Sequence, residues 1–323
     1  MHVGWTRSPT AQRRFLAGAL PVPEAGAVPI EFDLLTRGTA VTELAKRSED
    51  EGFRALVVGD HPGLTSSPFV TLAAAATATS TLRLGTSVLN AGIREPLLLA
   101  SDVATLDRIS EGRAELGLGA GHTPAEWEML GRVRPGPAER IAHLLRVAEE
   151  TSALLAGETV PVTGAVLPEP RPVQDRIPLL LGGGNPALLR WAGAHADAVG
   201  LAGLGRTLPD GHRHTAPWSE AQLRRHTGLV RAGAGEAALP VLEALVQHLE
   251  ITEDAETALN RLAEQLSVAP RDLRAVPYVL VGTVAQIVEE LRGHAERFGI
   301  TRFAIREEFH EAGSRILAEL NRS

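Results

Sequence analysis

Short apolar runs alternate with helical patterns along most of this 323-residue chain, and this alternation constrains its fold most strongly. Eight strands are predicted from the runs, over residues 28–35, 54–58, 82–88, 113–118, 177–181, 196–201, 239–249 and 301–305. Such runs are typical of strands that are buried on both faces, and alternating strand–helix units imply a parallel sheet. Eight units in one chain favour closure into a (β/α)₈ barrel over a doubly wound sheet. No Gly-x-Gly-x-x-Gly motif opens the first helix, which further disfavours a dinucleotide-binding doubly wound sheet.

The composition excludes several kinds of chemistry. The chain has 32 Lys and Arg against 39 Asp and Glu, and its formal net charge of -7 argues against a general nucleic-acid binder. It has no cysteine, so disulfides, thiolate nucleophiles and cysteine-bound metals are excluded. Its only lysine, Lys46, lies in a charge-patterned helix, where a solvated position is favoured over a Schiff-base or phosphate-binding one.

The segments outside the eight units are rich in proline and glycine. Residues 1–27 are interpreted as an N-terminal arm and residues 28–323 as a single catalytic barrel, with insertions after the fourth and sixth strands. The insertion at 203–217 is expected to shape a substrate pocket. No apolar run reaches the roughly 18 residues of a membrane span, and no secretory signal is recognised, so a cytoplasmic protein is expected.

Small and polar residues occupy the ends of the predicted strands, where barrel enzymes carry their active sites. The stretch 85–96 joins the third strand to the next helix and contains Ser87, Val88 and Asn90. The fifth strand ends in Gly182, Gly183, Gly184 and Asn185, and the sixth ends in Gly200.

The glycines after the fifth strand suit an anion site. They let a ligand approach the backbone closely, while Asn185 suits a helix N-cap and Pro186 the first helical position. The free N–H groups of that helix would then face the rim and bind a phosphate. The alternative is that these glycines only permit a tight turn.

Two histidines at strand ends are candidate acid–base groups. Asp60 and His61 follow the second strand, and His122 follows the fourth. A neutral imidazole can take or give a proton near pH 7. The alternative is a loop cap beside a solvated ring.

Other polar side chains are interpreted as structural. Glu126 and Glu128 are predicted to be first-turn helix carboxylates, and Trp127 a packing residue. Glu243 and Gln247 share one face of the seventh strand and are expected at the barrel mouth. The histidines at 212, 214 and 226 are predicted to lie in a solvated loop region, and no spacing matches a metal site.

Five segments together resemble the bacterial luciferase-like monooxygenase superfamily, and most closely its branch that uses the deazaflavin coenzyme F420. They are LVVGDH (56–61), LRLGTSVLNAGIREP (82–96), ATLDRISEGRAELGLGAGH (104–122), PRPVQDRIPLLLGGGNPALLRWAGAHADAVGL (170–201) and VPYVLVGTVAQIVEELRGHAERFGI (276–300). The resemblance implies a (β/α)₈ barrel with a flavin-like ring in its mouth.

The resemblance also implies roles for single residues. It places a non-prolyl cis peptide at Ser87–Val88 behind the ring, Asn90 beside the cofactor, and Gly182–Asn185 and Gly200 at its phosphate. His61, His122 and Asp60 are then the implied catalytic residues. A sugar-phosphate dehydrogenase is disfavoured, because His122 stands where such relatives carry glutamate and their phosphate-binding lysines are missing.

For the whole protein, the resemblance implies a homodimeric F420-dependent oxidoreductase that moves a hydride between the deazaflavin and a small organic substrate. Two alternatives stay open: an FMN-dependent monooxygenase of the same superfamily, and a non-catalytic barrel that acts as a binding or assembly protein.

Overall fold

The computed structural model of this protein describes residues 29–205, 207–208, 214–216 and 218–322. The predicted arm at 1–27 and the loop histidine at 212 lie outside the described residues. In the part of the chain that is described, no helix is long and apolar enough to cross a membrane.

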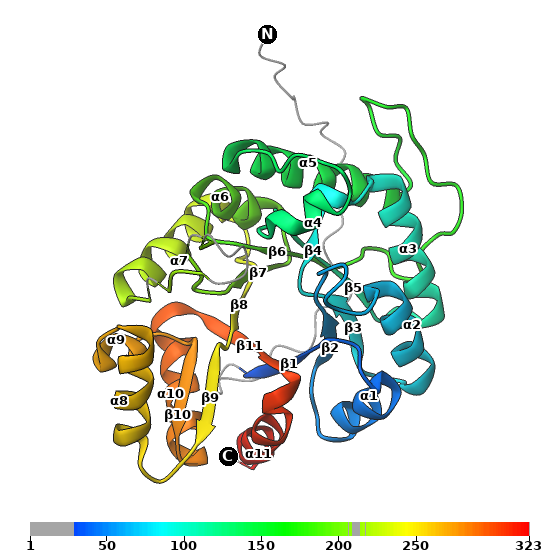
Figure 1. Ribbon diagram of the computed structural model, residues 1–323. Helices are drawn as coiled ribbons and strands as arrows, with labels where there is room; N and C mark the ends of the chain where they lie inside the picture. Colours follow the sequence, from blue (N-terminus) through cyan, green and yellow to red (C-terminus); the bar gives the residue numbers. More distant parts are fainter. Residues whose placement is uncertain (1–28, 206, 209–213, 217, 323) are drawn as a thin grey trace.

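The described residues form a closed barrel of eight parallel strands with helices around it (Figure 1). The pairing of β3 with β5 closes the ring, and β4 (Leu89–Asn90) continues beyond β3 along β5. The strands in spatial order are β3 (Arg83–Thr86), β2 (Ala55–Val58), β1 (Glu31–Thr36), β11 (Ile300–Arg306), β8 (Val241–Leu245), β7 (Ala198–Leu201), β6 (Leu179–Gly182) and β5 (Ala114–Gly119). The predicted (β/α)₈ barrel is confirmed.

The prediction of one strand over 239–249 is wrong. The chain leaves the barrel after β8, and β9 (His248–Ile251) pairs instead with β10 (Val279–Gly282), a strand that the sequence did not predict. The backbone explains the break: Val246 N–H still donates to Ala304 in the barrel, whereas Gln247 and His248 donate to the Tyr278 carbonyl.

Proline at the first helical positions starts many of the helices, as in α3 and α6, because its missing N–H would have no partner there. Helix α10 begins instead with a capping box between Thr283 and Gln286. The helices are α1 (Val41–Asp50), α2 (Pro68–Ala78), α3 (Pro96–Ile109), α4 (Pro124–Glu128), α5 (Pro137–Leu155), α6 (Pro186–His195), α7 (Glu220–Ala234), α8 (Ala255–Leu266), α9 (Pro270–Arg274), α10 (Val284–Phe298) and α11 (His310–Leu320).

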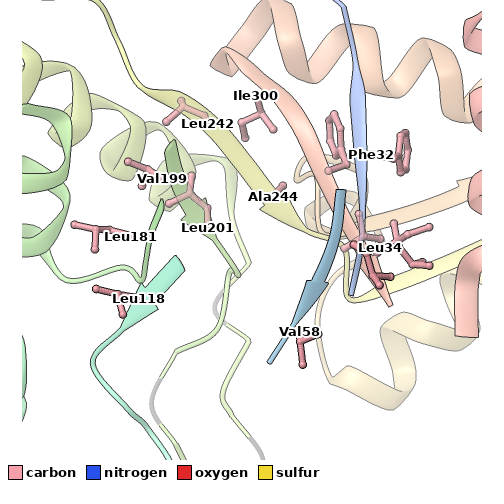
Figure 2. Close-up of a cluster of buried hydrophobic side chains, with 14 of the residues drawn as sticks. Phe32, Leu34, Val58, Leu118, Leu181, Val199, Leu201, Leu242, Ala244 and Ile300 are labelled. Carbon is pink, nitrogen blue, oxygen red and sulfur yellow. The ribbon is translucent and has the colours of Figure 1, made fainter. Parts of the chain in front are cut away.

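The hydrophobic core lies between the strands and the surrounding helices. Figure 2 shows apolar side chains of neighbouring strands in this layer, among them Leu118, Leu181 and Val199. Phe32 of β1 packs on Phe303 of β11 with ring centroids 5.9 Å apart. Burial of these side chains on the outer face of every strand leaves the inner face free for other residues.

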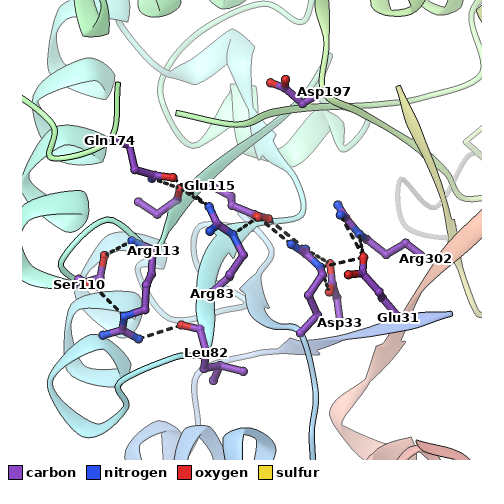
Figure 3. Close-up of polar contacts among 12 residues, drawn as sticks. Glu31, Asp33, Leu82, Arg83, Ser110, Arg113, Glu115, Gln174, Asp197 and Arg302 are labelled. Atoms are coloured by element: carbon purple, nitrogen blue, oxygen red, sulfur yellow. Dashed lines mark hydrogen bonds and ion pairs between the residues drawn. The ribbon is translucent and has the colours of Figure 1, made fainter. Parts of the chain in front are cut away.

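The floor of the barrel is filled by charged side chains (Figure 3). Arg54 lies at its centre, with Nε 2.7 Å from Asp33 Oδ1 and Nη1 2.7 Å from Glu115 Oε1. Burial by itself would lower the pKa of Arg54, but the charges of Asp33 and Glu115 raise it above its usual range. Burial would likewise raise the pKa of Glu115, yet Arg54 holds it at about 2. The floor is therefore a compact ion network rather than a pore.

Glu243 belongs to this floor, which corrects the expectation that it lies at the mouth. It is 3 % exposed, and burial followed by the charge of Asp33 raises its pKa well above the usual range. Gln247 does reach the mouth, where it accepts a hydrogen bond from Arg306 at 2.7 Å. Glu243 and Gln247 lie in different parts of the barrel because β8 ends at Leu245, between them.

Candidate active site

A cavity of about 660 Å³ opens at the C-terminal ends of the strands. Its wall contains six of the predicted site residues: Asp60, His61, Ser87, Val88, Asn90 and His122. It also contains residues that were not predicted to be catalytic or cofactor-binding, including Glu126, His214, Trp218 and Arg306. His214 lies in the insertion that was expected to shape the pocket. The C-terminal end of the strands is the place where ligands bind in (β/α)₈ barrels.

The stretch after β3 forms a shelf in this cavity. The peptide bond between Ser87 and Val88 is cis, which confirms the expectation. The Val88 side chain sits over two glycines of neighbouring strands: a Cβ on Gly119 would lie 2.5 Å from it, and one on Gly182 would lie 3.0 Å away. Gly119 therefore leaves the space that Val88 occupies, and Gly182 lies close beside it.

Asp60 positions the shelf. It is 2 % exposed, and its carboxylate accepts from Arg94 Nη2 at 2.7 Å, from Arg94 Nε at 3.0 Å and from the Asn90 backbone N–H at 3.3 Å. A bidentate arginine pair of this kind holds both partners in a fixed geometry. The contacts of Asp60 thus support a positioning role, which differs from the predicted catalytic one.

Glu126 is a first-turn helix carboxylate as predicted, but the sequence did not show that it is central to the site. It is 2 % exposed, its Oε1 lies 2.6 Å from Nδ1 of His61, and its Oε2 accepts from Nδ2 of Asn90 at 2.7 Å. Burial raises its pKa, but the hydrogen bonds from His61 and Asn90 outweigh burial and lower it. One signal was available: Glu126 is the third residue of a helix that starts right after β5, so it faces the rim.

Glu126 fixes the protonation of His61. A carboxylate only accepts hydrogen bonds, so Nδ1 of His61 carries the proton and Nε2 is left with a lone pair when the ring is neutral. Asn90 is occupied in the same network, because its Oδ1 accepts from Gly92 N at 3.0 Å. The arrangement holds one imidazole in a defined tautomer at the cavity wall, as an acid–base group requires.

Three imidazoles line up at this wall. The ring of His122 lies edge-on to His61 at 5.4 Å and to His214 at 4.7 Å between centroids. Burial, followed by the charges of His214 and His61, lowers the pKa of His122 to about 4. His122 is therefore neutral at pH 7. His214 was predicted to be solvated; instead it is half-buried in the cavity wall.

The lowered pKa of His122 predicts a pH effect on stability. Because the ring titrates at 6.5 when unfolded and at about 4 when folded, the stability that its neutral form contributes is present above pH 6.5 and is lost as the pH falls towards 4. As the pH falls through this window, the free energy of unfolding of His122→Phe should rise relative to that of the wild type, by up to about 1 kcal/mol per pH unit. Urea unfolding between pH 7.5 and 4.5 measures this, with the exposed His195→Phe as control. Parallel curves for wild type and His122→Phe would contradict the assignment.

The glycines after β6 lie beside the cavity. Asn185 caps α6 as predicted, accepting from Ala187 N at 2.9 Å and from Leu188 N at 3.3 Å, with Pro186 at the first helical position. Gly183 N–H donates to Gly200 O at 3.1 Å. These contacts suit the tight-turn reading, and Gly183, Gly184, Asn185 and Gly200 are not among the cavity-lining residues. Their phosphate-binding role stays a prediction.

Trp127 is a packing residue as predicted, because it is 5 % exposed and its ring lies where a Cβ on Gly92 would be. Among the described residues, no group of three or more histidine or carboxylate side chains is arranged to hold a metal ion. His226 was also predicted to be solvated, but it is half-buried and packs against Gly184.

Comparison with known proteins gives three kinds of match. A sequence model of luciferase-like monooxygenases matches residues 23–234. The chain is 34% identical over 180 residues to 5,10-methylenetetrahydromethanopterin reductase of Methanopyrus kandleri, covering 50% of this chain and 51% of the relative. It is 33% identical over 175 residues to an F420-dependent glucose-6-phosphate dehydrogenase of Beutenbergia cavernae, covering 50% and 52%. The matches thus span about half the length of these relatives.

Solved structures share the fold. One is the oxygenating constituent of a 3,6-diketocamphane monooxygenase from Pseudomonas putida in complex with FMN. It is 15% identical, covers 91% of this chain and 96% of that chain, and superposes with a TM-score of 0.67. The likeness supports the same barrel architecture.

Proposed function

This chain belongs to the luciferase-like monooxygenase family, and from that premise we propose that it is an F420-dependent oxidoreductase. It would transfer a hydride between C5 of the deazaflavin and a small organic substrate. The observation that carries the proposal is the pairing of His61 with buried Glu126 at 2.6 Å, beside the Ser87–Val88 shelf. The reductase and dehydrogenase relatives support the reaction class.

The residues at the shelf fit a flat heterocycle. Val88 packs against Gly119 and Gly182, so the surface of the shelf beneath a ring is apolar and closely packed. Ser87 and Asn90 place polar groups at the edge of the shelf, and both line the cavity. When bound there, the deazaflavin supplies the hydride chemistry, while the protein supplies orientation and electrostatics.

The chain's own side chains would handle the proton. Glu126 accepts from Nδ1–H of His61, so Nε2 is the nitrogen available to take a proton from a substrate hydroxyl or return it to a carbonyl. His122 stays neutral and adds no repelling charge beside His61. Trp218 and Leu204 add apolar surface to the cavity wall. Asp60 and Arg94 keep the shelf in place.

A fluorescence titration of the purified protein with F420 and with FMN tests the cofactor. We expect F420 to saturate the protein at low concentration and FMN to bind weakly. Tight FMN binding with oxygen consumption would replace the proposal with the monooxygenase alternative, which the FMN-bound structural neighbour supports. A folded barrel that binds neither cofactor would point to a non-catalytic binding protein.

We also propose that the chain forms a homodimer through α2 and α3. Helix α2, PFVTLAAAATA, has no charged residue on any side, although a helix at a solvated surface normally keeps a polar face. Val70 on α2 is 71% exposed and Leu98 on α3 is 66% exposed, and the two helices pack side by side. Such a patch on a monomer is typical of an interaction surface.

Light scattering after gel filtration tests the dimer. We expect the wild type to run as a dimer and Val70→Glu/Leu98→Glu to run as a monomer, because a buried interface does not tolerate unpaired carboxylates. Val162→Glu, at a position that is 80% exposed on the 157–176 excursion, is the matched control and should stay dimeric. A monomeric wild type would refute the proposal.

A further inference from the structure

Arg306 is the last residue of β11, and its side chain points into the cavity. Side chains alternate along a strand, so Arg302 and Arg306 share one face of β11. Arg302 contacts Glu31 in the charged floor inside the barrel (Figure 3), which makes this face the inner one. Arg306 lies about 13 Å further along the strand. It pairs in register with Leu35 of β1, and both residues line the cavity above the floor.

Neutral acceptors hold one part of the Arg306 guanidinium. Nη2 donates to Gln247 Oε1 at 2.7 Å, and Nη1 lies 3.3 and 3.5 Å from the carbonyl oxygens of Val246 and Gln247. A guanidinium has five N–H donors, so Nε–H and one N–H of Nη2 have no partner among the described residues. The Nε atom is not among the buried atoms that lack a partner, so solvent reaches it. The side chain is therefore held in place with free donors on the cavity side.

The positive charge of Arg306 forms no ion pair within the described part of the chain. Other arginines on the inner side of the barrel do form ion pairs. Arg54 contacts Asp33 at 2.5 Å, and Arg302 contacts Glu31 at 3.3 Å. Arg306 is half-buried like them, but it has only neutral acceptors. A half-buried cation without a counter-ion is stabilised by an anion that binds beside it.

The charged residues next to Arg306 leave this need unmet. Glu307 lines the cavity, but its Oε2 accepts from the Thr36 hydroxyl at 2.5 Å and from the Arg37 backbone N–H at 3.3 Å. Glu308 and the side chain of Arg37 are exposed at the same wall. Burial lowers the pKa of Arg306, the charge of Glu308 raises it and that of Arg37 lowers it, and the net shift is downward. The surroundings therefore do not compensate the buried charge.

We propose that Arg306 is a specificity-determining residue that binds a carboxylate carried by the substrate, so that the substrate class is a hydroxy acid or an oxo acid. Its free N–H groups can donate to both oxygens of a carboxylate. Strand β1 lies between β2, which leads to His61, and β11, which ends at Arg306. The two strand ends are thus about 10 Å apart, a distance that one small molecule spans. The oxidation or reduction of this substrate rests on the proposed function, whereas anion binding by Arg306 does not.

Nitrogen NMR tests anion binding without the cofactor. In the ¹⁵N-labelled full-length protein, in chloride-free buffer at pH 6.5, the Nε–H signal of Arg306 is assigned by comparison with Arg306→Gln. The probes are the ω-hydroxy acids from glycolate to 6-hydroxyhexanoate and their neutral amides. We expect at least one acid to shift the signal in a saturable way and its amide to leave it unchanged. The proposal fails if no acid shifts the signal or if the amides shift it equally.

Calorimetry with the F420-loaded protein tests the selectivity. We expect the acid that shifts the signal to bind about 10- to 100-fold more tightly than its amide, the size of one hydrogen bond to a charged group. Arg306→Gln should abolish this preference, and Arg306→Lys, which keeps the charge but loses the planar fork, should retain part of it. Arg315→Gln makes the same charge change at an exposed position of α11 and should leave the preference unchanged. Equal weakening of acid and amide in Arg306→Gln would show that Arg306 only fixes the chain after β8, which would overturn the proposal.

The cofactor is a second source of anionic groups, because F420 carries a phosphate and carboxylates on its side chain. Fluorescence titration of Arg306→Gln with F420, and with the same deazaflavin without these groups, separates the two sources. We expect both to bind as they bind the wild type. Weaker binding of F420 alone would assign the anion to the cofactor and overturn the substrate class. If the wild type binds no F420, the proposed function fails, but the NMR result on Arg306 still stands.

Discussion

Replacing Arg54 with methionine is expected to lower the free energy of unfolding by about 3–5 kcal/mol, the usual cost of breaking a buried ion pair from one side. The guanidinium of Arg54 contacts Asp33 and Glu115 inside the barrel floor, and the side chain is 12% exposed. Without it, Asp33 and Glu115, whose side chains are 1% and 15% exposed, would lose the cation that they share. Urea unfolding at pH 7.5, followed by circular dichroism, measures the loss.

Two companion variants make this result specific. Lys46→Met removes a surface charge that pairs with Glu43 at 3.8 Å, and it should cost less than about 1 kcal/mol. Arg54→Met combined with Asp33→Asn and Glu115→Gln should recover part of the loss, because the remaining groups are neutral. A loss for Arg54→Met as small as that of Lys46→Met would show that the floor network does not stabilise the barrel.

Replacing His61 with alanine is expected to reduce turnover by about 10²–10⁴-fold, the range that a positioned acid–base group contributes. The cofactor dissociation constant should change little, because His61 lies on the wall of the cavity and the shelf is formed by Ser87 and Val88. Single-turnover absorbance changes of F420, with a substrate found by screening alcohols and carbonyl compounds, measure the first quantity. Fluorescence titration measures the second.

Glu126→Gln extends this test to the tautomer. The amide can donate a hydrogen bond as well as accept one, so it no longer forces the proton onto Nδ1 of His61. Turnover should therefore fall, as it does for His61→Ala. His195→Ala, on the exposed end of α6, should leave both quantities unchanged. Equal losses of turnover and cofactor affinity in His61→Ala would contradict the acid–base role.

The local pattern of the sequence was sufficient for the architecture. Apolar runs buried on both faces, joined by helices, predicted the closed barrel, and the polar stretch 85–96 predicted a site at the end of the third strand. The cis bond at Ser87–Val88 was implied only by the resemblance of this stretch to the luciferase-like family. The local pattern misplaced the seventh strand. A run such as 239–249 records burial but not its partner, and the chain exchanges Ala304 for Tyr278 as its hydrogen-bond acceptor within this run.

The sequence by itself determined the barrel, the strand ends that carry the site and the presence of His61 and His122 there, because these depend on periodicity and on residues close in the chain. Only the tertiary structure decided which side chains meet. Glu126 reaches His61 across 65 positions, His214 arrives from another loop, and Glu243 turns to the floor beside Asp33. The closure of the barrel sets these contacts, since it fixes which strand ends are neighbours and which face of each strand points inward.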